Sequence, residues 1–192
     1  MSGTPSFRGQ RAVVLHRSGE TTERVTRQLA LLGLMADVRW LPLTDIADVD
    51  VVLVDADEGW TGLLPWRGAD EKPVPLVALL ASEAPGRIAW ALDQGADALL
   101  AKPVTPSAVY PALVMAARRH AEARAAVETV RELRERLRLR PLVLNAIERL
   151  RDARGWNEDE AYRHLRREAM RQRLTLEQCA AGVLAAGQGR RA

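Results

Sequence analysis

The chain has little of several residue types, and each shortage narrows what the protein can be. It holds one cysteine, Cys179, so no disulfide can form within the chain. Aromatic residues make up 4% of the sequence, which leaves any core to leucine, valine and alanine. No run approaches the roughly 18 uninterrupted apolar residues that a membrane span needs, and residues 1–10 lack the apolar segment of a secretory signal. We therefore expect a soluble, cytoplasmic protein with no membrane partner.

The sequence also lacks the residue sets that catalysis needs. It contains no nucleophile and base pair, no zinc-ligand spacing and no phosphate-binding loop. We therefore expect no enzymatic activity and no cofactor. A length of 192 residues allows one medium core or two small ones.

Lysine is absent from the C-terminal part of the chain, where arginine supplies every cation. Residues 1–117 carry 10 Lys and Arg against 14 Asp and Glu, whereas residues 118–192 carry 18 arginines against 11 acidic residues. A guanidinium presents a planar set of donors that suits phosphates and base edges, so a small basic domain of this kind indicates nucleic-acid binding. An arginine bias from a GC-rich coding sequence is the other explanation that composition leaves open.

The N-terminal part alternates short apolar runs with amphipathic stretches. An apolar run at 11–16 predicts a strand, and the amphipathic stretch at 20–32, which ends at Gly33, predicts a helix. Further strands are predicted at 36–41, 49–55, 74–81 and 97–101, with a helix at 85–94. This alternation predicts a parallel sheet flanked by helices, with any ligand site at the carboxyl ends of the strands.

Residues at these strand ends resemble the receiver domain of bacterial response regulators. Asp55 closes the third strand, Lys102-Pro103 follows the fifth, and Gly95-Ala96-Asp97-Ala98 lies at the start of that strand. The resemblance covers about residues 11–117 and implies a flavodoxin-like, five-stranded parallel sheet. It also implies that Asp55 stands where receivers accept a phosphoryl group.

Two elements of the receiver chemistry are missing. Receivers place a pair of acidic residues after strand one to bind the Mg²⁺ that neutralises the phosphoryl group, and here those positions hold His16 and Arg17. The hydroxyl residue that ends strand four in the family is replaced by Leu80. We therefore predict a pseudo-receiver without kinase-dependent phosphorylation, in which Asp55 forms a structural ion pair with Lys102 or Arg17.

Carboxylates cluster after the third predicted strand, at Asp55, Asp57 and Glu58. Clusters of this kind are more often solvated loop residues or charges near a helix N-terminus than metal ligands. We expect no metal site there, and we expect His16 to pack or orient its neighbours rather than bind a metal.

A stretch without glycine, from Thr105 to Arg154, predicts a long helix between the two parts of the chain. One heptad position holds Ala116, Ala123, Val130, Leu137 and Leu144, and the other holds Arg119, Ala126, Leu133, Arg140 and Ile147. Because arginine interrupts the second set twice, the pattern indicates a weak coiled coil, adequate for a homodimer that its domains also hold. A single amphipathic helix lying on its own domain is the alternative. Pro141 is expected to kink or restart the helix, since it removes an amide donor and clashes with the preceding turn.

Capping signals divide the C-terminal part into three predicted helices. The first spans 142–153 and stops at Gly155; the second spans 158–172 and the third 176–186. Asn157 with Glu160 begins the second helix, and Thr175 with Gln178 begins the third.

The second of these helices has an apolar side and a basic side. Ala161, Leu165 and Ala169 repeat on the apolar side. The basic side holds Arg163, Arg167 and Arg171, flanked by Arg166 and Arg173. These guanidinium groups recur about every 6 Å along the helix, near the spacing of nucleic-acid phosphates. A solvated charged face, balanced by acidic neighbours, is the alternative.

The run from Gly155 to Met170, GWNEDEAYRHLRREAM, closely resembles the ANTAR domain, an RNA-binding three-helix module of bacterial antiterminators. One departure lies in the preceding helix, where the family has Ala-Lys-Gly and this chain has Ala146-Ile147-Glu148. The missing lysine shifts the predicted RNA contacts to Tyr162 and the arginines of the basic side. Arginine and tyrosine can stack on or hydrogen-bond the unpaired bases of a hairpin loop.

The order of these parts resembles the AmiR family of amidase-operon antiterminators. The predicted parts are a tail at 1–10, a pseudo-receiver domain at 11–117, a coiled-coil linker at 118–140, an ANTAR domain at 141–187 and a tail at 188–192. The resemblance implies a dimer that binds hairpins in the leader of a nascent transcript and prevents the terminator from forming. It also implies that a sensor protein like a periplasmic binding protein sequesters the regulator until a small molecule releases it. Two alternatives stay open: a phosphorylation-dependent response regulator acting through Asp55, and a DNA-binding helix-turn-helix activator.

Overall fold

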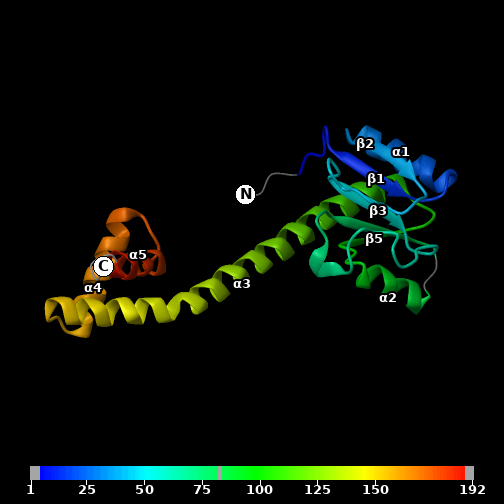
Figure 1. Cartoon of the computed structure of the whole chain (residues 1–192). Helices are drawn as coiled ribbons and strands as arrows, with labels where there is room; N and C mark the ends of the chain where they lie inside the picture. The colour runs from blue at the N-terminus through cyan, green and yellow to red at the C-terminus, as the bar shows by residue number, and fades with distance from the viewer. Residues whose placement is uncertain (1–4, 82–83, 189–192) are drawn as a thin grey trace. The chain divides into compact units, whose positions relative to one another are not determined.

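The structure, a computed structural model, describes residues 5–81 and 84–188 (Figure 1). The two predicted tails, at 1–10 and 188–192, therefore lie partly outside the described residues. The chain divides into two compact units, Met1–Arg124 and Ala125–Ala192, and one long helix contributes to both.

The first unit is built on a five-stranded parallel sheet with the order β2-β1-β3-β4-β5. The strands are β1 (Arg11–Leu15), β2 (Met35–Arg39), β3 (Val51–Asp55), β4 (Leu76–Leu80) and β5 (Ala98–Ala101). This is the doubly wound order of flavodoxin-like folds, in which ligands bind at the carboxyl ends of the strands. The predicted fold class is confirmed, and every predicted strand is present.

Helices cover one face of the sheet. Val25 and Leu29 of α1 (Glu20–Leu31) and Leu113 of α3 (Pro106–Arg154) are buried in the same apolar cluster as Val14 and Leu53 of the central strands. All of β3 is buried, as expected for a central strand that is covered on both sides.

Loop residues cover much of the other face, together with α2 (Pro85–Asp93). Leu43, Leu63 and Trp66 are buried there against Val52 and Ala78 of the sheet. Within the described residues, the connection from β2 to β3 contains no helix, and the connection from β3 to β4 contains only the 3₁₀ turn η1 (Ala69–Glu71). The regular alternation of strands and helices that the sequence suggested therefore fails on this side, where loops supply the apolar cover.

Helix α3 runs for 49 residues without interruption (Figure 1). The expectation that the helix restarts at Pro141 is wrong, as is the expectation of a separate helix at 142–153, which is the last part of α3. Proline removes one amide donor and leaves the carbonyl of Leu137 without its helical partner. Both residues are exposed, so water can hydrate that carbonyl, while Val143 and Ala146 bury the next turns in the second core.

The second unit packs the end of α3 against α4 (Glu158–Gln172) and α5 (Leu176–Gln188). Its buried core consists of Val143, Ala146, Ile147, Leu150, Ala161, Leu165, Ala169, Cys179 and Ala180. Helix α4 begins with the predicted capping box, in which Asn157 and Glu160 each accept a 2.9 Å hydrogen bond from the other's backbone amide. Thr175 and Gln178 make the equivalent reciprocal pair at the start of α5. The three predicted helical segments are all present, the first as part of a longer helix.

Candidate functional site

The receiver-site remnant, defined as His16, Arg17, Asp55, Leu80 and Lys102, lies at the carboxyl ends of the parallel strands. The Asp55 side chain is 4% exposed, and its Oδ1 accepts a 2.8 Å hydrogen bond from Nζ of Lys102. His16 Nε2 lies 3.1 Å from the other carboxylate oxygen, without the geometry of a hydrogen bond. Both oxygens of the carboxylate therefore face a side chain of this chain.

Lys102 bridges two carboxylates. Its Nζ lies 2.8 Å from Asp57 Oδ2 as well as from Asp55 Oδ1. Burial by itself lowers the pKa of Lys102, but the hydrogen bonds and charges of Asp55 and Asp57 outweigh it, so the pKa lies above its usual value. The lysine is thus held as a cation between the two acids, and the predicted pair of Asp55 and Lys102 is present.

Arg17 does not reach Asp55, although the sequence left that pairing open. Its Nε lies 2.5 Å from Glu58 Oε2, and its guanidinium stacks over the Trp40 ring at 5.6 Å. His16 is oriented by its backbone and by Thr22: its Nδ1 donates to the Arg17 carbonyl at 2.7 Å and lies 3.2 Å from the Thr22 hydroxyl. The two positions that hold metal-binding acids in receivers are therefore occupied here by an oriented imidazole and an ion-paired guanidinium.

Leu80 closes strand β4 as an apolar residue. It is half-buried and packs against the cluster on the loop-covered face, and its carbonyl accepts a 2.7 Å hydrogen bond from the Lys102 amide. No hydroxyl is present at this position to contact a phosphoryl group. Across the described ranges, no group of three His, Cys, Asp or Glu side chains is placed to hold a metal ion.

Helix α4 of the second unit has the two sides that the sequence predicts. Ala161, Leu165 and Ala169 are buried on one side, at 0%, 0% and 4% exposure. The arginines of the other side are exposed, and Tyr162 is 40% exposed beside them. The helix therefore holds the core together while presenting a basic surface to solvent.

The arginines of this surface differ in how they are engaged. Arg171 forms a 2.5 Å ion pair with Glu168, which also accepts a hydrogen bond from Gln172, and these bonds lower the pKa of the Glu168 carboxyl. Arg163 Nε donates to the Asp159 carbonyl at 3.2 Å. In the described part of the chain, neither Arg166 nor Arg167 makes a hydrogen bond or an ion pair.

Arg173 has a structural position of its own. It is the C-cap of α4 and adopts the left-handed backbone conformation, with φ of 56°. Glycine is the usual residue in that conformation, so Arg173 ends the helix at some cost in backbone strain. Its side chain is exposed.

A groove runs along the basic side of α4. Its volume is about 560 Å³, and it is lined by Trp156, Glu160, Arg163, Arg166, Arg167 and Met170. Three of the predicted RNA contacts therefore share one hollow, whereas Tyr162, Arg171 and Arg173 lie outside it. Sequence reasoning missed Trp156; the available signal was an aromatic residue directly before the N-cap of a basic helix.

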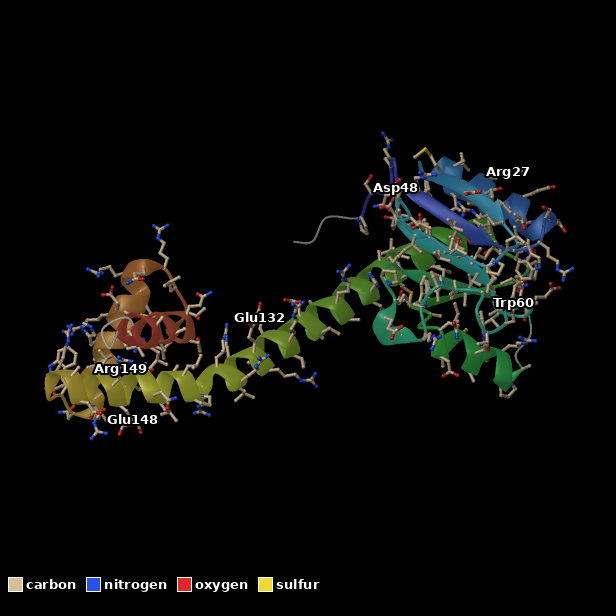
Figure 2. All side chains as sticks on the ribbon, in the orientation of Figure 1. Arg27, Asp48, Trp60, Glu132, Glu148 and Arg149 are labelled. Atoms are coloured by element: carbon tan, nitrogen blue, oxygen red, sulfur yellow. The ribbon has the colours of Figure 1, made fainter. Side chains whose placement is uncertain are left out.

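The position where the ANTAR family has lysine lies in the core of this chain. Ile147 is 6% exposed and packs in the second apolar cluster. Glu148, the next residue, points away from α4 and α5, whereas Arg149 points toward them and donates to the Leu184 carbonyl at 3.3 Å (Figure 2). No contact to a nucleic acid can come from Ile147, and the basic side of α4 carries the positive charge instead.

The middle of α3 has an exposed apolar stripe, defined as Val130, Leu133, Leu137 and Leu144. These side chains are 45%, 51%, 64% and 55% exposed, and every residue from 121 to 138 is exposed. The alternative of an amphipathic helix lying on its own domain therefore finds no support in the described residues. These four residues belong to the predicted heptad, whereas two of its other apolar members, Ala116 and Ile147, are buried in the cores of the two units. None of the helices in the described ranges has the length and hydropathy of a membrane-crossing segment.

Together, the receiver-like sheet and the three-helix basic unit define a two-part transcription regulator. The chain matches the N-terminal domain of AmiR over residues 10–117 and the ANTAR domain over residues 131–184. The AmiR match covers more than half of the length of this chain, so the chain belongs to the AmiR family. It also carries the ANTAR domain that the sequence predicted.

Two relatives are similar in sequence. The aliphatic amidase regulator of Pseudomonas aeruginosa is 28% identical over 177 residues, which cover 88% of this chain and 87% of that protein. The transcriptional regulatory protein PdtaR of Mycobacterium tuberculosis is 35% identical over 116 residues, which cover 60% of this chain and 57% of PdtaR.

Two solved structures, one of them of the response regulator StyR, are similar in fold. StyR has a TM-score of 0.54 at 16% identity, and full-length FixJ of B. japonicum has a TM-score of 0.50 at 16% identity. Each match covers 92% of this chain and 98% of the other. At these identities the likeness concerns the fold alone.

Proposed function

We propose that the protein is a cytoplasmic transcription antitermination regulator, not an enzyme, that binds hairpins in leader RNA through its C-terminal unit. The observation that carries the proposal is the basic side of α4, where exposed arginines line a groove beside Trp156. Guanidinium groups bind phosphates and stack on unpaired bases, and hairpin loops offer both. The ANTAR match covers this unit, and the aliphatic amidase regulator relative aligns along most of the chain.

The contacts follow from the exposure of this surface. Tyr162, Arg163, Arg166, Arg167, Arg171 and Arg173 are the proposed RNA contacts. Arg166 and Arg167 are the strongest among them because no acidic neighbour in the described residues pairs with them. The ion pair with Glu168 must break before Arg171 can bind a phosphate with its full charge.

A homodimer is supported by the exposed apolar stripe on α3. Leucine and valine at heptad positions gain stability when a second helix covers them, and α3 offers about one such side chain per turn between 130 and 144. Covering each side chain contributes roughly 1–2 kcal/mol. We propose that two copies pair along this stripe, with residues 118–140 as the linker between a pseudo-receiver domain at 11–117 and an RNA-binding domain at 141–187.

The filled receiver-site remnant supports control without phosphorylation. His16 and Arg17 stand where the metal-binding acids are needed, and Leu80 replaces the hydroxyl residue at the end of β4. A cation at the position of Arg17 repels Mg²⁺, which phosphoryl transfer requires. We propose that a ligand-sensing protein, similar to a periplasmic binding protein, sequesters the regulator and releases it when a small molecule binds.

The experiment compares binding of the full-length protein to a leader-RNA hairpin and to the matching duplex DNA. A hairpin whose loop has been closed into a continuous stem serves as the control for base exposure. We expect tight binding only to the hairpin with an open loop. Equal or stronger binding to the duplex would support the helix-turn-helix alternative and reject the proposal.

A second experiment tests the phosphorylation alternative. The protein is treated with acetyl phosphate, and separately with beryllium fluoride and Mg²⁺, and its mass and oligomeric state are measured. We expect no phosphoryl adduct on Asp55 and no change in assembly. An adduct that changes the oligomeric state or hairpin affinity would establish a phosphorylation-dependent regulator instead.

A further inference from the structure

Trp156 forms one wall of the groove on the second unit. It lies between α3 and α4, is half-buried, and packs against the core that α3, α4 and α5 share. Arg154 stacks over its ring at 4.7 Å, and the His164 ring lies 4.9 Å away, tilted by 58°. An indole held by its core contacts and by two neighbours is pre-ordered, so a ligand that binds it loses little additional side-chain entropy.

The other walls are cationic. Arg163, Arg166 and Arg167 line the groove, and Glu160 is its one acidic residue among those described. The Glu160 carboxylate already accepts a hydrogen bond from the Asn157 amide in the capping box. The groove therefore keeps a net positive charge that favours an anion.

His164, which lies beside the groove, is surrounded by the same positive charges. Burial lowers its pKa first, and the charges of Arg154 and Arg167 lower it further. Glu168 acts in the opposite direction, and Arg171 adds to the lowering. The net charge near Trp156 and His164 is therefore positive even though Glu168 is close to His164.

An indole beside several guanidinium groups selects one kind of ligand. Because Arg154 stacks over the Trp156 ring, a flat ligand must displace Arg154 or stack on the opposite face. A nucleobase is flat and stacks on indole, and its flanking phosphates carry the negative charges that the arginines need. Met170, which is 69% exposed, adds a polarizable apolar surface at the other end of the groove. An acidic peptide would use the arginines but not the ring, and a base inside a duplex keeps its stacking partners. The volume of about 560 Å³ lies in the range of roughly 300–1,000 Å³ that suits groups of this size.

We propose that this groove binds one unpaired base of the RNA loop, stacked on Trp156, with the phosphates on either side of that base held by Arg163 and Arg167. The inference rests on the proposed RNA binding and assigns the base-stacking role to a residue outside the arginine surface. The arginines then supply sequence-independent attraction, whereas Trp156 distinguishes an open loop from a closed stem.

The test compares Trp156→Leu and Trp156→Phe in the full-length protein. Leucine keeps the apolar contacts with the core and removes the aromatic face, whereas phenylalanine keeps a ring. Since base stacking contributes about 1–3 kcal/mol, W156L should weaken hairpin binding roughly 5- to 150-fold, and W156F less than about 5-fold. Trp60→Leu, on the other unit at 39% exposure, is the matched control and should bind like the wild type.

Hairpins with single abasic loop positions identify the stacked base. For the wild type, one abasic position should lower affinity by about the same factor as W156L. For W156L, that same position should cause no further loss, because the interaction is already absent. Equal losses in both proteins at every position would overturn the assignment of the base to Trp156.

The outcomes separate this inference from the proposed function. If the wild type binds the hairpin and W156L binds equally well, the groove proposal is wrong and the RNA-binding function stands. If the wild type does not prefer the hairpin, both are wrong. If W156L weakens duplex binding as strongly as hairpin binding, the groove does not read unpaired bases.

A second measurement covers the case in which W156L fails to fold. The five tryptophans of the wild-type protein are replaced biosynthetically by 5-fluorotryptophan, and W156F and W60F assign the resonances of Trp156 and Trp60 among them. Addition of the hairpin should shift the Trp156 resonance and leave the Trp60 resonance in place. An unmoved Trp156 resonance at saturating RNA rejects the proposal, and this measurement does not need W156L.

Discussion

Lys102→Met tests whether the receiver-site remnant has become a structural ion cluster. Methionine retains most of the apolar stem of lysine but removes the cation, leaving Asp55 and Asp57 without the ammonium that lies 2.8 Å from each. Removing one partner of a buried ion pair costs about 3–5 kcal/mol, because the remaining charge stays buried. The Lys102 side chain is 13% exposed, so some water reaches the site. We therefore expect a cost of about 3 kcal/mol.

Asp55→Asn should cost less than Lys102→Met. In D55N the lysine keeps its bond to Asp57, and the asparagine oxygen can still accept from Nζ. The hydrogen bond is then kept but loses the charge of the carboxylate, at a cost of about 1–2 kcal/mol.

Thermal unfolding of the first unit measures both costs. For a unit of this size, between the ranges for 60–100 and 150–250 residues, 1 kcal/mol lowers Tm by roughly 3–5 °C, so K102M should lower Tm by about 10 °C. Arg24→Met, which removes an exposed ion pair with Glu20, is the control and should change stability by less than about 0.5 kcal/mol. If K102M behaves like R24M, or if D55N costs more than K102M, the reasoning is refuted.

The same lysine predicts a dependence on alkaline pH. Its pKa is raised in the folded protein, so the folded state holds the proton more tightly than the unfolded state. The stabilisation is complete below about pH 10, the ordinary range for lysine, and fades as the pH rises through the folded value. Between pH 9 and pH 12 the wild type should therefore lose stability more steeply than K102M.

Three further predictions concern the second unit and the connecting helix. Arg167→Ala should weaken hairpin binding and lower the slope of log affinity against log salt concentration by about one. Arg171→Ala should weaken binding less, because Arg171 is paired with Glu168. Equal effects of the two substitutions would show that this ion pair does not limit the contribution of Arg171. Leu137→Glu should shift the protein toward monomer in sedimentation, with the exposed Arg138→Gln as the control, and an unchanged dimer would exclude the stripe as the interface. The pKa of His164 is lowered in the free protein, and bound phosphates should raise it. Hairpin affinity should therefore rise as the pH falls from 7.5 to 5.5, and His164→Gln should make this pH dependence smaller.

Patterns of hydrophobicity were sufficient to predict the sheet. The central strands β1, β3 and β4 contain apolar runs that are almost wholly buried, and such runs leave a clear signal. The edge strands are less buried: β2 is largely exposed, and β5 alternates buried with exposed residues. The loop residues that cover the face of the sheet opposite α1 and α3 were not predictable in this way. Leu43, Leu63 and Trp66 come from loops and have no period, so only the tertiary structure shows that they replace helices there.

Local rules failed where packing outweighs them. The propensity of proline predicts a break at Pro141, yet burial of Val143 and Ala146 just beyond it holds the helix together. The pairing of Asp55 with Lys102 was predictable because receivers bring those strand ends together. The sequence could not show that Arg17 forms its ion pair with Glu58. The groove beside Trp156 depends on the angle at which the chain enters α4, which no spacing rule encodes.

Helix α3 also has a genetic consequence. Its first turns complete the core of the sheet unit, its middle carries the apolar stripe, and its last turns belong to the basic unit. A premature stop codon shortly after Arg154 would therefore produce a chain with an intact sheet unit and the whole stripe but without α4 and α5. Under the proposed pairing, such a product would assemble with full-length chains into dimers with only one basic surface. Nonsense alleles in this short interval should be dominant, whereas those within the sheet should be recessive.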